Sequence, residues 1–121
     1  MNSATSKNLV FLFKSSPYGD SRAKEGLDAL LAASIFEQKI SLIFVGDGVN
    51  QLVKNQAPSE NKNYGKMLSA LPMYDITAVF ALKDDMDERG LSPSNCVIEV
   101  SAINVDAAQQ LLSAADHVFS Y

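Results

Sequence analysis

Two side chains of this sequence have the chemistry of reactive groups, a single thiol and a single imidazole. Cys96 is the one candidate for a thiol nucleophile, and His117 is the one candidate for an imidazole base. A reactive cysteine prefers an exposed, electropositive position, often at a helix N-terminus, where the thiolate is stabilised. Cys96 instead directly precedes a predicted strand, at the end of the sheet away from the edge where ligands collect. We therefore interpret Cys96 as an inert, half-buried thiol and His117, which has no Asp or Ser in an obvious triad relation, as structural.

The count of cysteine and histidine also limits covalent and metal chemistry. One cysteine cannot form an intrachain disulfide, which agrees with a reducing compartment. One Cys and one His cannot assemble a zinc-type site from this chain alone. We expect neither a metal nor another cofactor.

Three polar segments follow predicted strands, where an open α/β sheet holds its ligands. The loop Ser15–Asp20 has two hydroxyls before a helix N-terminus and could hold an anion, but it lacks the glycines and lysine of a phosphate-binding loop. Asp47 follows the second strand, and we interpret it as the cap of a short helix. The acidic run Asp84–Glu88 could bind a metal, yet negative charge in the first helical turn is favourable by itself. We interpret that run as a solvated helix face.

The elements that must position these side chains alternate between strands and helices. Short apolar runs bounded by turn residues are typical of strands buried on both faces, and they predict strands at Leu9–Phe13, Ile40–Val45, Ile76–Leu82, Val97–Val100 and His117–Phe119. Apolar residues at helical spacing predict a helix at about 20–38. Further helices are predicted at about 49–53, 64–71 and 104–115, with a short charged helix at 83–89 that Gly90 ends. Asn104 is the expected cap of the last helix. This alternation indicates a mostly parallel sheet covered by helices on both faces, with a strand order that the sequence leaves open.

Length and charge narrow the class of protein further. The chain has 121 residues, which predicts one domain over residues 1–121. Residues 1–7 are polar, lack the apolar run of a secretory signal, and are expected to form a flexible lead-in. The net charge is −4 with scattered Lys and Arg, so we expect no direct binding to nucleic acid. No run approaches ~18 consecutive apolar residues, so we expect no membrane helix.

Several short segments occur together in an order and spacing that one family shares. The most specific is Glu25–Ala32, and the others are Ser16-Pro17-Tyr18-Gly19, Asp47-Gly48-Val49 with Gln51-Leu52, Leu71 with Tyr74-Asp75-Ile76, and Glu88-Arg89-Gly90-Leu91. From about Lys7 to Tyr121 the chain resembles the TusC/DsrF family of the DsrE/DsrF/DsrH-like group. The resemblance implies a three-layer α/β/α fold with a central parallel sheet of about five strands.

The resemblance also implies a role in sulfur transfer in the cytoplasm. Members assemble with TusB-like and TusD-like subunits into a heterohexamer of two heterotrimers. That complex passes persulfide sulfur from a TusA-like to a TusE-like carrier, towards 2-thiouridine at the wobble position of tRNA; related DsrEFH complexes serve dissimilatory sulfur metabolism. The sulfur-carrying cysteine belongs to the TusD/DsrE subunit, after its third strand. The corresponding segment here, Phe80-Ala81-Leu82-Lys83, has no cysteine, so the resemblance implies a non-catalytic subunit.

A structural subunit must bury apolar surface against its partners. We predict Tyr18, Phe36, Met73 and Tyr74 as interface residues. The alternative for Met73 and Tyr74 is that they close one end of the core. Two other functions stay open at this point: a sulfurtransferase that uses Cys96, and a small anion-binding or ligand-binding module that uses Ser15–Gly19.

Overall fold

A computed structural model describes residues 7–14, 22–36, 38–53 and 62–121. Within these residues, five strands form one parallel sheet in the order β4-β3-β2-β1-β5. The strands are β1 (Asn8–Phe13), β2 (Lys39–Phe44), β3 (Ala78–Leu82), β4 (Ser101–Ile103) and β5 (His117–Ser120). The α-helices are α1 (Arg22–Ala33), α2 (Lys62–Ser69), α3 (Lys83–Glu88) and α4 (Val105–Ala114), and the 3₁₀-helices are η2 (Gly46–Leu52), η4 (Leu71–Tyr74) and η5 (Pro93–Asn95).

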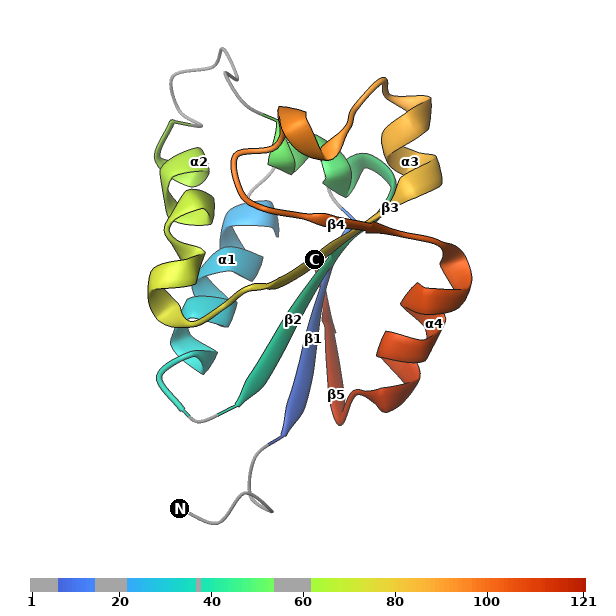
Figure 1. Cartoon of the computed structure of the whole chain (residues 1–121). Helices are drawn as coiled ribbons and strands as arrows, with labels where there is room; N and C mark the ends of the chain where they lie inside the picture. Colours follow the sequence, from blue (N-terminus) through green and yellow to red (C-terminus); the bar gives the residue numbers. More distant parts are fainter. Residues whose placement is uncertain (1–6, 15–21, 37, 54–61) are drawn as a thin grey trace.

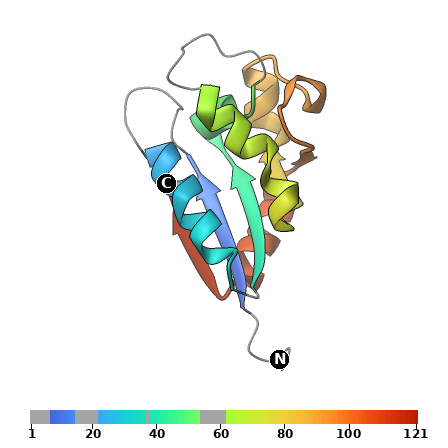
Figure 2. The same ribbon diagram turned by 90° about the vertical axis from the view of Figure 1, so that its left-hand side faces the viewer.

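The helices form a layer on each side of the sheet, as the alternating sequence pattern predicts. Figure 1 shows α1 and α2 on one side of the sheet and α4 on the other, with α3 near the carboxyl ends of the strands. Turned by 90°, α1 and α2 lie in front of the sheet (Figure 2). The predicted three-layer α/β/α fold with a parallel sheet is therefore confirmed. In the part of the chain described here, no helix combines the length and the apolar character needed to cross a membrane.

The core lies between the central strands and α1. Side chains alternate between the two faces of a strand, so every second residue of β1 and β2 points to the same helix layer. On the α1 side, Phe13 and Phe44 are fully buried and their rings stack with centroids 4.9 Å apart. Leu27 and Leu30 of α1 are also fully buried in this cluster. Through these buried side chains, α1 packs against the sheet.

The strand predicted at Val97–Val100 is wrong, because the fourth strand begins only at Ser101. The apolar character of the segment has another cause. Ile98 and Val100 are buried in the core, while the N–H of Val97 donates to the carbonyl of Leu52 at 2.8 Å. The segment therefore fills the core and contacts the end of η2 without joining the sheet. The predicted cap of α4 is confirmed, since Asn104 Oδ1 accepts from the N–H of Ala107 at 2.8 Å.

Candidate functional site

The carboxyl ends of the strands are the edge at which the sequence predicts any ligand or reactive group. The loop after β1, with its serines and Tyr18, lies outside the described residues. After β3 the chain has no loop, because Leu82 is the N-cap residue of α3 and Lys83 is its first residue. Leu82 is half-buried and Lys83 is exposed. In the TusD-like subunit, the resemblance implies a sulfur-carrying cysteine at this position. This chain has Leu82 and Lys83 there, whose side chains are an isobutyl group and an ammonium.

A group of polar contacts fastens α3 to the turn after β2. Asp85 Oδ2 accepts from the backbone N–H of Gly46 at 2.7 Å. Arg89 Nη2 contacts Asp47 Oδ1 at 2.9 Å, and Arg89 Nη1 donates to the carbonyl of Asp85 at 3.0 Å. The predicted capping role of Asp47 is wrong, because η2 already begins at Gly46 and its N-cap residue, Val45, makes no side-chain cap hydrogen bond. Asp47 instead holds the guanidinium that bridges two elements.

Three carboxylates of the acidic run contact groups on their own helix, on the residue after it or on the adjacent turn: Asp85 contacts Gly46, Asp87 contacts Lys83 and Glu88 contacts Arg89. Lys83 Nζ donates to Asp87 Oδ2 at 2.7 Å, and that hydrogen bond is the main reason the pKa of Lys83 is raised. A lysine with an ordinary pKa is already protonated at neutral pH, and the contact with Asp87 favours the same charged form, so the side chain is an ammonium without a free electron pair for nucleophilic attack. Among the described residues, no group of three or more His, Cys, Asp or Glu side chains is placed to hold a metal ion.

The hydrogen bond between Asp85 and Gly46 gives a first testable prediction. Asp85→Ala should lower the free energy of unfolding by about 1–2 kcal/mol, because the partly buried N–H of Gly46 loses a charged acceptor. Asp84→Ala removes a carboxylate from the adjacent, exposed position and should change stability by about 0.5 kcal/mol or less. Urea unfolding followed by circular dichroism measures both values. Equal effects of the two substitutions would show that the contact does not stabilise the turn.

The one thiol of the chain lies in the interior. Cys96 follows η5 and is 6% exposed, more buried than the sequence predicts. We expected Cys96 to precede a strand directly, and this prediction is wrong. Cys96 instead forms an isolated antiparallel bridge with Val53, and its Sγ lies 3.7 Å from the carbonyl oxygen of Ser92. His117 is exposed at the start of β5, with its ring tilted against that of Phe119. The fold therefore does not bring Cys96 and His117 into one catalytic group.

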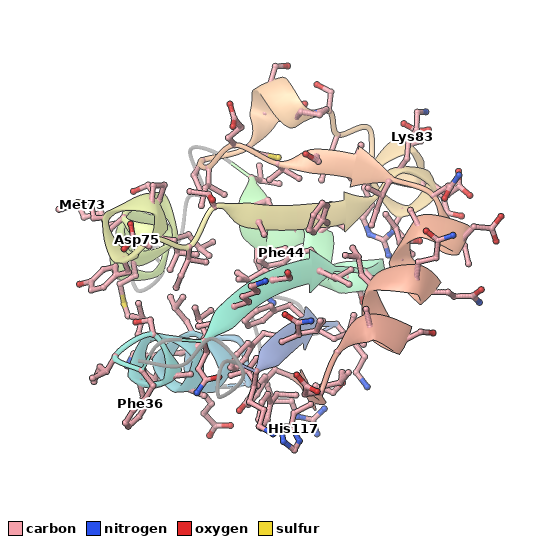
Figure 3. The ribbon with its side chains drawn as sticks, turned by 60° about the horizontal axis from the view of Figure 1, so that its bottom comes forward. Phe36, Phe44, Met73, Asp75, Lys83 and His117 are labelled. Carbon is pink, nitrogen blue, oxygen red and sulfur yellow. The ribbon has the colours of Figure 1, made fainter. Side chains whose placement is uncertain are left out.

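Three of the predicted interface residues, Phe36, Met73 and Tyr74, lie at the opposite end of the strands, whereas Tyr18 lies outside the described residues. Figure 3 places Phe36 and Met73 at one side of the molecule and Lys83 at the other. Phe36 is 66% exposed, Met73 is 84% exposed and Tyr74 is 52% exposed. Ile35, which is not among the predicted interface residues, is 80% exposed beside Phe36. We call Ile35, Phe36, Met73 and Tyr74 the amino-edge patch.

The residues of the amino-edge patch lie on two chain segments, each of which leads into a strand. Ile35 and Phe36 come between α1 and β2, whereas Met73 and Tyr74 end η4 just before β3. The left-handed backbone of Asp75, with φ of 62°, ends η4 and starts the turn towards β3. Leu71, at the start of η4, is fully buried and anchors the connection, so Met73 and Tyr74 point outward from a fixed position. The alternative that these two residues close the core does not hold for exposed side chains.

The comparison with known proteins agrees with the fold. The family model described as DsrE/DsrF-like matches residues 7–121. A "Protein TusC homolog" of Vibrio parahaemolyticus serotype O3:K6 is 39% identical over 115 residues, which are 93% of this chain and 98% of that protein. "Protein TusC" of Buchnera aphidicola subsp. Baizongia pistaciae is 36% identical over 118 residues, 95% of this chain and 99% of that protein.

Solved structures with lower sequence identity share the same fold. The crystal structure of the ychN protein from E. coli superposes with a TM-score of 0.84 at 24% identity, covering 95% of this chain and 99% of that chain. A protein of unknown function from Methanobacterium thermoautotrophicum gives a TM-score of 0.70 at 16% identity, with the same coverage of both chains. With a family model that matches nearly all its length and TusC proteins among its relatives, the chain belongs to the DsrE/DsrF-like family, as a member of its TusC/DsrF group.

Proposed function

We propose that this chain is a non-catalytic subunit of a TusBCD-like sulfurtransferase complex in the cytoplasm. Its partners are a TusB-like and a TusD-like subunit, in a heterohexamer of two heterotrimers. The complex receives persulfide sulfur from a TusA-like carrier and delivers it to a TusE-like carrier, for 2-thiouridine synthesis at the wobble position of tRNA. The names of the curated relatives support this assignment, because they are TusC proteins of nearly the same length.

The observation that carries the non-catalytic role is the chemistry at the end of β3. Sulfur transfer through persulfides needs a thiolate that attacks the donor and then holds the sulfur. Leu82 has no such group, and Lys83 is a protonated ammonium paired with Asp87. A subunit with these side chains can line a shared cleft, but it cannot hold the transferred sulfur there.

The burial of Cys96 supports the same role. A persulfide donor must bring its own sulfur into line with the attacking thiolate, and a side chain that is 6% exposed does not offer that approach. Burial also disfavours the thiolate itself, since an apolar environment stabilises the neutral thiol. Cys96 therefore acts as a small apolar residue beside Val53.

Labelled sulfur tests this proposal directly. When the co-expressed three-subunit complex is incubated with a labelled persulfide donor, we expect the label on the TusD-like subunit and none on this chain. Complexes with Cys96→Ser and with Cys96→Ala should transfer sulfur at the wild-type rate, because neither substitution removes a sulfur carrier. Two variants are needed because a buried hydroxyl has a stability cost that a methyl group does not have.

Label that stays on the isolated wild-type chain and is lost in both Cys96 variants would contradict the non-catalytic role. It would support the alternative in which this chain is itself a sulfurtransferase. Failure to co-purify with TusB-like and TusD-like subunits would contradict the assembly instead, so the two parts of the proposal can fail separately.

A further inference from the structure

One methionine is far more accessible than the other methionines that the structure describes. Met73 is 84% exposed, whereas Met67 is half-buried against the core and Met86 is 1% exposed. Met1 lies outside the described residues. Cys96, the other kind of oxidisable sulfur, is 6% exposed. Within the described part of the chain, Met73 is therefore the sulfur-containing residue that a dissolved oxidant reaches most easily.

The backbone on both sides holds Met73 at the surface. Met73 lies in η4, which begins at the fully buried Leu71 and ends at Asp75 in a left-handed conformation. The N–H of Met73 donates to the carbonyl of Ala70 at 2.9 Å, and the N–H of Asp75 donates to the carbonyl of Pro72 at 3.1 Å. In Figure 3 the side chain of Met73 points away from the sheet. Its exposure is thus a property of a folded, hydrogen-bonded turn.

We propose that Met73 is a site of oxidation by hydroperoxides, and that its sulfoxide makes the amino-edge patch unfit for assembly. The thioether sulfur attacks one oxygen of hydrogen peroxide, an S–O bond forms and the O–O bond breaks. The sulfur is oxidised by two electrons and the peroxide is reduced by two. The proton on the transferred oxygen passes to the departing hydroxide, which leaves as water. Methionine sulfoxide reductases reverse the change, so the site can return to its first state.

The effect on assembly rests on the proposed function, under which a TusB-like or TusD-like subunit covers the patch. Met73 is exposed together with Ile35, Phe36 and Tyr74 at the same end of the strands. A thioether suits an apolar contact because it is flexible and polarisable, whereas a sulfoxide carries a polar oxygen. Burial of that oxygen without a hydrogen-bond donor opposes association. Oxidation of the free subunit therefore blocks its assembly, and the covering subunit protects Met73 in the finished complex.

Peptide mass spectrometry of the isolated chain tests the oxidation site. The folded chain is treated with hydrogen peroxide, and the oxygen gained by each methionine peptide is followed over time. We expect Met73 to be oxidised at least about ten times faster than Met86, with Met67 between them. Equal rates in the folded chain would overturn the proposal. So would a difference that persists in urea, because the local sequence and not exposure would then set the rate.

Capture of the partner subunits tests the effect on assembly. The treated chain is freed of peroxide and mixed with untreated TusB-like and TusD-like subunits. We expect oxidation to weaken capture at least about tenfold, and a methionine sulfoxide reductase to restore it. In Met73→Leu, peroxide should leave capture at the untreated level of that variant. Met67→Leu is the matched control, because it retains Met73, and peroxide should weaken its capture as in the wild type.

The two measurements keep this inference separate from the proposed function. A wild-type chain that captures partners equally well before and after oxidation of Met73 would overturn the inference and leave the proposed function standing. Weakening that Met73→Leu does not prevent would do the same. An untreated chain that captures neither subunit would overturn the proposed function together with the effect on assembly, while the oxidation rates would still decide whether Met73 is the site.

Discussion

Gly48→Ala should reduce the free energy of unfolding by at least about 3 kcal/mol, a large part of the stability of a small domain. Gly48 is the third residue of η2, at the carboxyl end of β2, and it lies against the end of β1. A Cβ atom at this position would be 2.0 Å from the carbonyl oxygen of Phe13 and 2.7 Å from its carbonyl carbon. These are main-chain atoms of a central strand, so they cannot rotate away as a side chain would.

Gly46 offers a control in the same turn. It has φ of +53°, and a Cβ added there meets nothing within 4 Å. Gly46→Ala therefore has only the cost of a left-handed backbone, about 1–2 kcal/mol. Urea unfolding of both variants separates steric exclusion from backbone strain. If Gly48→Ala is no less stable than Gly46→Ala, the close approach of the turn to β1 does not determine the stability of this edge.

The layers of the fold could be predicted because the strong sequence signals are local. Continuous apolar runs such as Leu9–Phe13 and Ile40–Val45 give strands buried on both faces, and both are central strands of the sheet. The run Val97–Val100 has the same composition but lies outside the ladder. Burial against the core produces the same apolar pattern as burial within a sheet, so composition alone could not distinguish the two.

Which residue types stand at the carboxyl ends of the strands could be predicted from the sequence, whereas the contacts that those residues make could not. The absence of a thiol after β3 is visible in the letters of the sequence. The link between Asp47 and Arg89 joins residues far apart in the chain, and nothing local indicates it. Ile35 shows a related difficulty. Its spacing from Leu27 and Leu31 is helical and would place it on the buried face of α1, but α1 ends at Ala33 and Ile35 is 80% exposed.

The amino-edge patch bears on the proposed assembly because its four apolar side chains are exposed at the same end of the strands. A monomeric domain has little reason to expose Ile35, Phe36, Met73 and Tyr74 together at one edge. Aromatic residues and Met are enriched in the buried centre of protein interfaces, where a few of them carry most of the binding energy. Under the proposed function, the occupant of this patch is a TusB-like or TusD-like subunit.

Phe36→Glu combined with Met73→Glu should weaken the capture of those subunits at least about tenfold, since two charges would be buried without partners. The folded chain itself should be unaffected, because both side chains are mainly exposed and exposed substitutions change stability by about 0.5 kcal/mol. Affinity purification from cells that co-express the three subunits measures the loss, and thermal unfolding of the purified variant checks its fold. Val105→Glu adds a charge at an exposed valine away from the patch and should retain both partners. If the double variant also retains them in wild-type amounts, the partners bind elsewhere, and the exposure of Met73 needs a different explanation.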